Sequence, residues 1–213
     1  MLELYFLKET ASTQTYLIQQ IKEKKLHVPV CVYATKQTQG IGSRGNNWIG
    51  IEGNLFMSFA VAISSLPKDL KLESASIYFA SLLWEVLREN GVDVWLKWPN
   101  DFYVQDKKAG GMITTIIREN LICGVGLNIV SAPEGFTTIN TNLSVEEIIK
   151  QFIKKLENFQ SWKQVFRKYS VEFYKNKSFY THKQNQERIS LADAKLQEDG
   201  SIIVNNERIY SLR

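Results

Sequence analysis

Cysteine and long apolar runs are scarce in this chain of 213 residues. Its two cysteines, Cys31 and Cys123, each lie in a strand-like apolar run, whereas a disulfide framework needs a denser pattern in a small secreted protein. No stretch approaches the ~18 apolar residues of a membrane-spanning helix. The N-terminus carries Glu3 and lacks the apolar core of a signal peptide. These absences predict buried free thiols, a cytoplasmic location and no membrane partner.

The chain also has only a small excess of positive charge. It contains 26 basic and 22 acidic residues, which gives a net charge of +4. The basic excess gathers in residues 150–188, where ten Lys or Arg accompany three Glu. A solvated face of one or two helices is the simplest interpretation, and a landing surface for an acidic partner protein is the functional alternative. Nucleic-acid binding has no helix-turn-helix, zinc-finger or aromatic RNA-binding signature to support it.

Hydrophobic periodicity divides the chain into strands and helices of ordinary length. Apolar and β-branched runs predict strands at 2–7, 29–36, 54–63, 92–98, 102–105, 109–118 and 121–130. Helical spacing with Ser12 and Ser144 as N-caps, and Gly91 as a stop, predicts helices at 13–25, 72–90, 144–159 and 162–176. The strands at 102–105 and 109–118 are expected to form a hairpin that turns at residues 106–108. The order indicates an α+β fold, with a mixed or antiparallel sheet and helices mostly on one side.

The pattern changes near residue 178, where short strands replace helices. Asp199-Gly200 and Asn205-Asn206 are dipeptides that suit tight turns with positive φ. We therefore expect two parts, a larger one at 1–177 and a small β domain at 178–213.

A glycine-dense polar loop occupies residues 40–53 and holds five of the twelve glycines. Glycine lets successive backbone N–H groups converge on an anion, because no side chain blocks its approach. Arg44 adds a permanent positive charge with a fork suited to phosphate or carboxylate, and Trp48 would supply an aromatic wall. The alternative is an ordinary mobile loop. The spacing is not that of a P-loop, and a lone Gly-x-Gly is weak evidence for a dinucleotide site.

A second motif, residues 97–111, places two lysines around an Asn-Asp pair. Lys97 lies in an apolar strand, and Lys108 directly precedes Ala-Gly-Gly, where small residues let a ligand come close. Most lysines are solvated surface groups, but these two settings favour a binding role. A lysine ammonium here would hold a carboxylate against a nucleotide α-phosphate and offset the repulsion between the two anions. Asp101 would bind Mg²⁺ or accept a proton from an attacking amine.

Five blocks in family order resemble the biotin–protein ligases of the biotin/lipoate ligase family. Lys-Trp-Pro-Asn-Asp stands unchanged at 97–101, and Lys-x-x-Gly stands at 108–111. The Gly-Arg-Gly-Arg-x-Gly-x-x-Trp loop of the family corresponds to 40–48, its Gly-x-Gly-x-Asn strand to 124–128, and its Ser-Thr-Asn start to Ser12-Thr13-Gln14. Together the blocks are highly specific, although each alone would not be.

The resemblance implies a class II synthetase-like biotin/lipoate ligase fold with a small SH3-like C-terminal β domain. It implies that biotin and MgATP react to biotinyl-5′-AMP and pyrophosphate. A lysine of a biotin carboxyl carrier protein, from acetyl-CoA carboxylase or a related carboxylase, would then attack this intermediate and release AMP. The strand expected at 2–7 already starts the catalytic part, so the resemblance suggests a monofunctional ligase without a DNA-binding domain. Both a monomer and a homodimer remain open.

The resemblance also assigns site residues by position. Biotin would contact Ser12, Thr13, Gln14, Gln37, Gly40, Ile41, Gly42, Ser43, Lys108 and Gly110. The nucleotide would contact Arg44, Trp48, Lys97, Asn100, Asp101 and Asn128. The catalytic residues would be Lys108, Asp101 and Arg44, and Asp101 would also face Mg²⁺.

Two arginines of the family loop are replaced here, by Ile41 and Ser43. Since those arginines help the loop fold over the adenylate, we hypothesise that this loop retains its intermediate less tightly, unless Arg44 and other groups compensate. Two other functions stay open. A lipoate–protein ligase shares the fold and the chemistry, and a non-enzymatic binding module would use the basic residues at 150–188.

Overall fold

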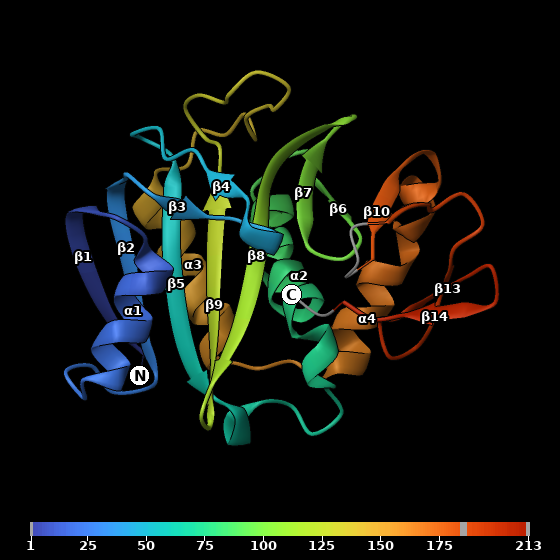
Figure 1. The fold of residues 1–213 in the computed structure, drawn as a ribbon. Helices are drawn as coiled ribbons and strands as arrows, with labels where there is room; N and C mark the ends of the chain where they lie inside the picture. The colour runs from blue at the N-terminus through green and yellow to red at the C-terminus, as the bar shows by residue number, and fades with distance from the viewer. Residues whose placement is uncertain (1, 184–186, 212–213) are drawn as a thin grey trace.

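A seven-stranded sheet forms the centre of the computed structural model, which describes residues 2–183 and 187–211 (Figure 1). The side chain of Arg44 lies outside this description. The strands, in spatial order, are β1 (Glu3–Thr10), β2 (Val30–Gln37), β5 (Leu55–Ala62), β9 (Asn120–Leu127), β8 (Lys107–Ile117), β7 (Asp101–Val104) and β6 (Trp95–Lys97). Strands β1 and β2 are parallel, and every other neighbouring pair is antiparallel. The expected mixed sheet is therefore confirmed.

Helices cover both faces of the sheet unequally (Figure 1). One face carries α1 (Thr13–Lys22), whose Leu17 packs with Val30, Ala60 and Ile122. The larger core lies on the opposite face, under α2 (Ala75–Glu89) and α3 (Val145–Glu157), with α4 (Trp162–Val171) against α2. The prediction of helices mostly on one side is thus confirmed.

Local signals fix where the helices begin and end. Ser12 caps α1 by accepting a hydrogen bond from the backbone N–H of Thr15. Ser144 and Glu147 form the predicted capping box of α3, and Ser161 with Gln164 forms a second one on α4. Short 3₁₀ segments at Ile63–Ser65 and Leu72–Ser74 connect β5 to α2. No helix in the described part of the chain has both the length and the apolar character needed to cross a membrane.

The C-terminal part is built from short strands, as predicted. After the 3₁₀ segment Phe173–Ser178 come β10 (Tyr180–His182), β11 (Arg188–Ser190), β12 (Lys195–Leu196), β13 (Ile202–Val204) and β14 (Glu207–Ile209). Asn205 and Asn206 both have positive φ and close the β13–β14 hairpin. Residues 212–213, the end of the expected β domain, lie outside the described residues.

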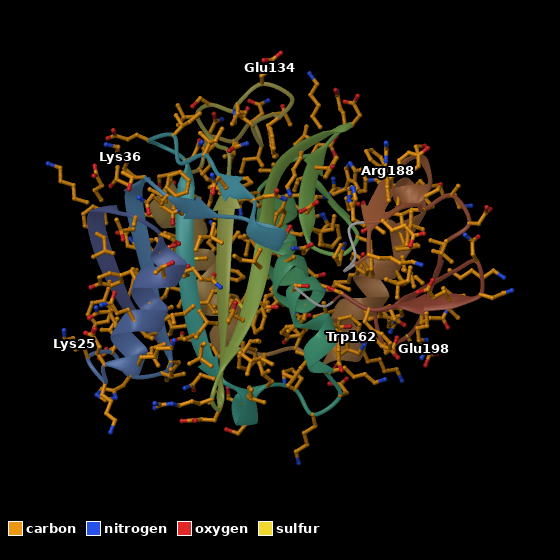
Figure 2. The ribbon with its side chains drawn as sticks, viewed as in Figure 1. Lys25, Lys36, Glu134, Trp162, Arg188 and Glu198 are labelled. Atoms are coloured by element: carbon orange, nitrogen blue, oxygen red, sulfur yellow. The ribbon has the colours of Figure 1, made fainter. Side chains whose placement is uncertain are left out.

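The C-terminal part packs firmly on the rest. The indole N–H of Trp98 donates to the carbonyl of Gly200, and that of Trp162 donates to the carbonyl of Glu198. Figure 2 shows Trp162 and Glu198 close together at this boundary. Ile202 and Val204 belong to the same apolar cluster as the α2 side chains. A shared core of this kind holds β10 to β14 in a fixed place beside the sheet, so their side chains can contribute to a site on it.

Several predicted boundaries were wrong in detail. The expected loop at 40–53 contains a small hairpin of β3 (Gly40–Ile41) and β4 (Asn47–Trp48), joined by the 3₁₀ turn Ser43–Gly45. Lys107 and Lys108 belong to β8 rather than to its turn, and the helix predicted at 162–176 splits after Val171. Elements of two or three residues carry no periodicity, so the sequence pattern did not reveal them.

The free buried thiols predicted for Cys31 and Cys123 are confirmed. The basic segment 150–188 is partly neutralised by carboxylates that precede it in the sequence. Buried Glu85 pairs with both Lys155 and Lys168, at 3.3 and 2.8 Å. This pairing agrees with the simpler interpretation of the basic segment, in which its lysines lie on helix faces and are stabilised there by ion pairs.

Candidate active site

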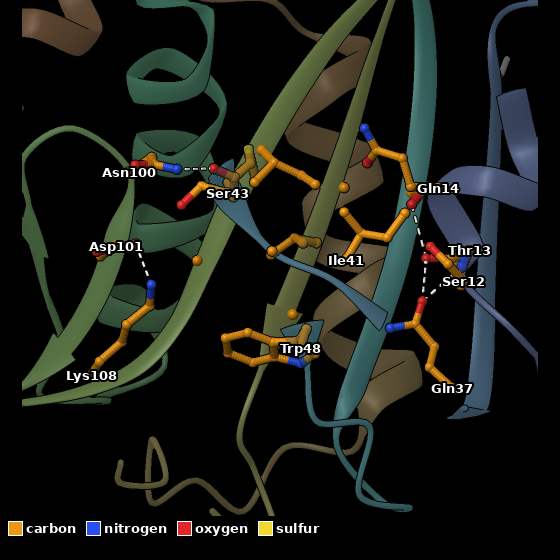
Figure 3. A pocket seen from close by; sticks show the side chains of 18 residues that line it. Ser12, Thr13, Gln14, Gln37, Ile41, Ser43, Trp48, Asn100, Asp101 and Lys108 are labelled. Carbon is orange, nitrogen blue, oxygen red and sulfur yellow. Dashed lines mark hydrogen bonds and ion pairs between the residues drawn. The ribbon is translucent and has the colours of Figure 1, made fainter. Parts of the chain in front are cut away.

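A cavity of about 40 Å³ lies on the face of the sheet that carries α1, beneath the β3–β4 hairpin (Figure 3). Strand register explains its position, because residues paired across neighbouring strands share one face. Ser58 pairs with Gly124, and Gly124 pairs with Ile113, so three strands form the floor. The lining residues are Ser12, Thr13, Gln14, Gln37, Ile41, Gly42, Ser43, Trp48, Ser58, Asn100, Asp101, Lys108, Gly111, Met112, Ile113, Gly124, Val125 and Gly126.

Glycines in the strands of the floor leave space for side chains that come from α1 and from the β3–β4 hairpin. A Cβ at Gly124 would stand 2.0 Å from Oε1 of Gln14, which extends from α1. A Cβ at Gly126 would stand 2.6 Å from Cε2 of Trp48, which extends from β4. Contacts this short cannot occur, so the two glycines on β9 are required for Gln14 and Trp48 to lie on the sheet.

A neutral polar network closes one end of the cavity. Oε1 of Gln37 accepts hydrogen bonds from the backbone N–H and the hydroxyl of Thr13, at 2.7 and 3.0 Å. The Thr13 hydroxyl also lies 2.9 Å from that of Ser58, and Nε2 of Gln14 donates to the Thr115 hydroxyl at 3.2 Å. This end offers uncharged donors and acceptors, which suit a polar but neutral part of a ligand.

Charged residues occupy the opposite end (Figure 3). Asp101 pairs with Lys97 across β6 and with Gly111 across β8, so the three positions form one row on the cavity face. Nζ of Lys108 lies 2.7 Å from Oδ1 of Asp101, and Nζ of Lys97 lies 3.9 Å from its Oδ2. Lys97 and Asp101 are buried, whereas the Lys108 side chain is 27% exposed. The more accessible lysine is therefore the one placed to meet an anionic ligand.

Burial also acts on Tyr103, whose ring lies 5.6 Å from Nζ of Lys97. Burial first, and the negative charge of Asp101 second, raise the pKa of Tyr103 above its usual value. Its hydroxyl therefore stays protonated at neutral pH and can donate a hydrogen bond.

Three buried polar atoms on the cavity wall have no hydrogen-bond partner within the described protein. They are Oε1 of Gln14, Nε1 of Trp48 and Oδ1 of Asn100. Buried polar atoms are nearly always hydrogen-bonded in folded proteins, because an unpaired one loses its hydration without compensation. Their gathering around one cavity favours a ligand that would supply the missing partners.

The segment after β9 is held by a residue that sequence reasoning missed. Oδ1 of Asn54 accepts from the backbone N–H groups of Ile129 and Val130, at 2.8 and 3.0 Å. Asn128 is buried and donates to the Thr137 carbonyl at 3.3 Å, so its side chain helps order this segment. An asparagine directly before a buried strand is the sequence signal that could have identified Asn54.

Most residues predicted for the site come together on the cavity wall. Those in the lining are Ser12, Thr13, Gln14, Gln37, Ile41, Gly42, Ser43, Trp48, Asn100, Asp101 and Lys108. Four further predicted residues lie elsewhere in the described chain. Gly40 packs under the Trp48 backbone, Gly110 packs on Leu127, Asn128 orders the next segment, and Lys97 lines a neighbouring cleft. The Arg44 side chain lies outside the described part.

Further lining residues were not assigned to the site from the sequence, although Gly111, Gly124 and Gly126 belong to the motifs that carry the family resemblance. Ser58, Gly111, Met112, Ile113, Gly124, Val125 and Gly126 all come from central strands. The sequence showed which residues alternate within each strand. Which of them line the cavity depended on the register between neighbouring strands, which the sequence of one strand does not give.

The sequence model of the biotin/lipoate A/B protein ligase family matches residues 6–128. A solved crystal structure similar to this chain is that of a biotin acetyl coenzyme A carboxylase synthetase from Helicobacter pylori with bound biotinylated ATP. The two sequences are 38% identical. The match covers 99% of this chain and 100% of that one, with a TM-score of 0.93. A biotin protein ligase from Aquifex aeolicus, in complex with biotin and ATP, shares the fold at 24% identity and a TM-score of 0.74.

Curated relatives match over shorter stretches. The bifunctional ligase/repressor BirA of Escherichia coli is 33% identical over 124 residues, which cover 55% of this chain and 37% of that protein. Biotin–protein ligase 2 of Arabidopsis thaliana is 33% identical over 152 residues, 61% of this chain and 44% of that one. The matches span between 34% and 52% of the first three curated relatives. With its motifs, its mixed sheet and its SH3-like C-terminal strands, the chain belongs to the biotin/lipoate A/B protein ligase family.

Proposed function

We propose that this protein is a biotin–protein ligase, which joins biotin to a lysine of a biotin carboxyl carrier protein at the expense of ATP. The observation that carries the proposal is the position of Lys108. Its ammonium lies at the charged end of a cavity whose other end is neutral and polar and whose floor is glycine. Biotin has the same order of groups, a neutral ureido ring, an apolar body and a terminal carboxylate.

Each end of the cavity suits one end of biotin. Thr13, Ser58 and Gln37 offer hydroxyl and amide groups to the ureido oxygen and its N–H groups. Trp48 over Gly126 offers an apolar wall to the fused rings. The volume of about 40 Å³ is far below that of a drug-sized ligand, so Gln14 would move off the glycine floor when biotin enters, whereas Trp48 would stay over Gly126 as the wall.

Adenylation would take place at the charged end. A biotin carboxylate oxygen attacks the α-phosphorus of ATP, a new O–P bond forms, and the bond to pyrophosphate breaks with its electron pair on the leaving group. Lys108 would hold the carboxylate and the α-phosphate together and offset the repulsion between them. Asp101, at 2.7 Å, would fix the direction of the Lys108 ammonium.

Transfer would follow in the same place. The uncharged amine of the carrier lysine attacks the carbonyl carbon of the mixed anhydride, an amide bond forms, and AMP leaves. Asp101 is the carboxylate on the cavity wall and would accept the proton that the amine loses. Asn100 and Trp48 would face the nucleotide, and Asn128 would order the segment beside it.

Magnesium was predicted at Asp101, but the residues here do not fit a resident ion. Among the described residues, no group of three His, Cys, Asp or Glu could hold a metal. Both oxygens of Asp101 already face lysine ammonium groups. We therefore propose that Mg²⁺ enters as part of the MgATP substrate, and none of the steps above depends on a protein-held metal.

The acceptor, the location and the domain division complete the proposal. The acceptor would be the carrier subunit of acetyl-CoA carboxylase or a related carboxylase, met in the cytoplasm. The C-terminal part from residue 178 would form the small β domain, fixed to the sheet by Trp98 and Trp162.

The test mixes the protein with biotin, ATP and Mg²⁺ and looks for biotinyl-AMP by mass spectrometry and for released pyrophosphate. A parallel reaction with lipoate distinguishes the related ligase. Biotin should also raise the melting temperature, because it binds the folded protein only. If neither acid gave an adenylate, the proposed function would be wrong, and if lipoate alone reacted, the substrate would be wrong.

A further inference from the structure

The side chain of Gln14 occupies the neutral end of the cavity. It extends from the first turn of α1, and the residue is only 5% exposed. Its Oε1 lies on the floor, where a Cβ at Gly124 would stand 2.0 Å away. Figure 3 shows the side chain at the end of the cavity opposite Lys108. The free volume of about 40 Å³ is the space that remains beside this carboxamide.

A hydrogen bond to a distant segment holds the carboxamide in this position. Nε2 of Gln14 donates to the hydroxyl of Thr115 at 3.2 Å, across 101 positions of sequence. Thr115 stands on β8 two residues beyond Ile113, which lines the cavity, so both side chains lie on the same face of the sheet. Thr115 is half-buried and is not among the described residues that line the cavity. Its effect on the cavity therefore passes through Gln14.

The other end of the same carboxamide has no partner. Oε1 of Gln14 is buried, and no group of the described protein donates a hydrogen bond to it. A buried acceptor without a partner loses its hydration without compensation. The side chain is thus satisfied at its nitrogen and unsatisfied at its oxygen, as expected of a group that exchanges partners when a ligand binds.

Biotin and this carboxamide need the same space. In the proposed function the ureido ring lies beside Thr13, Gln37 and Ser58. The Ser58 hydroxyl and Oε1 of Gln14 crowd one point of the floor, because a Cβ at Gly124 would stand 3.3 and 2.0 Å from them. When the carboxamide makes way for the ring, its bond to Thr115 breaks. The ring N–H groups of biotin then supply the partner that Oε1 lacks.

We propose that Thr115 is a positioning residue that keeps Gln14 in a closed position, so that biotin binds only after the bond between Gln14 and Thr115 is broken. The inference rests on the proposed function, which it deepens by assigning the closed state of the biotin site to one hydrogen bond. The apparent affinity for biotin is then the intrinsic affinity reduced by the fraction of open sites. The free energy of one neutral hydrogen bond changes that fraction by about twofold to tenfold.

The test measures biotin binding by isothermal titration in the wild type, Thr115→Val and Thr115→Ser. Valine keeps the shape of threonine without its hydroxyl, so Thr115→Val should tighten binding by about twofold to tenfold. Serine keeps the hydroxyl, so Thr115→Ser should bind biotin like the wild type. In the adenylation assay, Thr115→Val should lower KM for biotin and leave kcat unchanged, because the saturated site is open in every variant.

A double-mutant cycle shows whether Thr115 acts through Gln14. Gln14→Ala removes the carboxamide and changes the affinity for biotin by an amount of its own. In this background Thr115→Val should have no further effect, because the bond that it breaks is already absent. Thr115→Ala, which also lacks the hydroxyl, replaces Thr115→Val in the cycle if the valine variant does not fold.

Three results would overturn the inference. Unchanged affinity in Thr115→Val would show that the bond does not restrain the site. Weaker binding would show that Thr115 holds Gln14 in its biotin-binding position instead. Tighter binding that persisted in the Gln14→Ala background would show that Thr115 acts by another route. Failure of the proposed function is distinguishable, since biotin binding without any adenylate would reject the ligase activity and leave the closed position of Gln14 intact.

Discussion

The indole of Trp48 lies directly on Gly126, so close that a Cβ at position 126 would stand 2.6 Å from Cε2 and 2.7 Å from Nε1. Trp48 belongs to the β3–β4 hairpin and Gly126 to the central strand β9. The hairpin therefore lies over the cavity only because the floor lacks a side chain at this point. The buried Nε1 of Trp48, which has no partner, marks the same contact as a place for a ligand.

Gly126→Ala should weaken biotin binding. The added methyl group cannot share space with the indole, and overpacking of this kind typically costs ~1–3 kcal/mol, which corresponds to about fivefold to 150-fold in affinity. Isothermal titration with biotin measures the change. In a Trp48→Ala background the same glycine substitution should cost much less, because the clashing ring is gone. Equal costs in both backgrounds would show that the contact between residues 48 and 126 is irrelevant to binding.

Lys108→Ala should abolish most of the adenylation activity. Loss of one preorganised charged contact in a reaction site typically lowers kcat by ~10²–10³. Release of pyrophosphate in the presence of biotin and ATP measures the rate. Lys107→Ala is the matched control, since Lys107 is the adjacent, exposed residue on β8 and does not line the cavity. If Lys108→Ala formed adenylate at the wild-type rate, Lys108 would not be the anchoring cation.

Ser43→Arg should reduce the escape of the intermediate. The resemblance places an arginine at this position, and Ser43 lines the cavity together with Lys108. A guanidinium here would add a contact to the adenylate, so fewer bystander lysines on added albumin should become biotinylated. Blotting for biotin measures the labelling, and Ser64→Arg, an exposed residue of the Ile63–Ser65 turn, controls for the added charge. Equal labelling by wild type and Ser43→Arg would reject the leaky-loop hypothesis.

Asp199→Asn should lower the melting temperature by several degrees. Its carboxylate accepts from the hydroxyl of Ser201 at 2.5 Å and lies 3.1 Å from Nζ of Lys71, thereby joining the C-terminal part to the segment before α2. Loss of hydrogen bonds to a charged group costs ~1–3 kcal/mol, which corresponds to about 2–4 °C per kcal/mol in a protein of this size. Thermal unfolding followed by circular dichroism measures the change.

The same carboxyl group predicts a pH dependence. Burial alone raises the pKa of Asp199, but the hydrogen bonds from Ser201 and Lys71 outweigh it and lower the pKa from 3.8 to about 2. Because the folded-state pKa is the lower one, the stabilisation is complete above about pH 5 and disappears as the pH falls from about 4 to about 2. The difference in melting temperature between wild type and Asp199→Asn should shrink over that range. A difference that stayed constant down to pH 2 would contradict the assignment.

Much of the fold was predictable because its signals are local. Ser12, Ser144 and Gly91 act within one turn of the helix that each begins or ends, so a single sequence reveals them. The alternation of apolar residues likewise gave the central strands to within a few residues. Lys108 and Asp101 were both predicted to be catalytic. Nζ of Lys108 lies 2.7 Å from Oδ1 of Asp101 because the two residues stand seven positions apart on one tight hairpin.

The floor of the cavity was not predictable in this way. Ser58, Gly111 and Gly124 lie on one face because β5, β8 and β9 pair in a particular register. A shift of one residue in a strand would move its position in the floor to the opposite face of the sheet. The sequence of one strand does not give its register with another. The contact of Thr13 with Gln37 depends in the same way on how α1 packs over β2.

The sequence by itself determined the local elements and the chemical groups available, since helix caps, alternating apolar residues and the lysine-bearing hairpin act over a few neighbouring residues. Only the tertiary structure decided which of these groups meet. It placed the glycines of β9 under Gln14 and Trp48, and it brought Arg188 to the same cleft as Lys108, which stands 80 positions earlier in the chain. The physical reason is that contacts between distant segments depend on strand register and on burial of a shared core, which involve the whole chain at once.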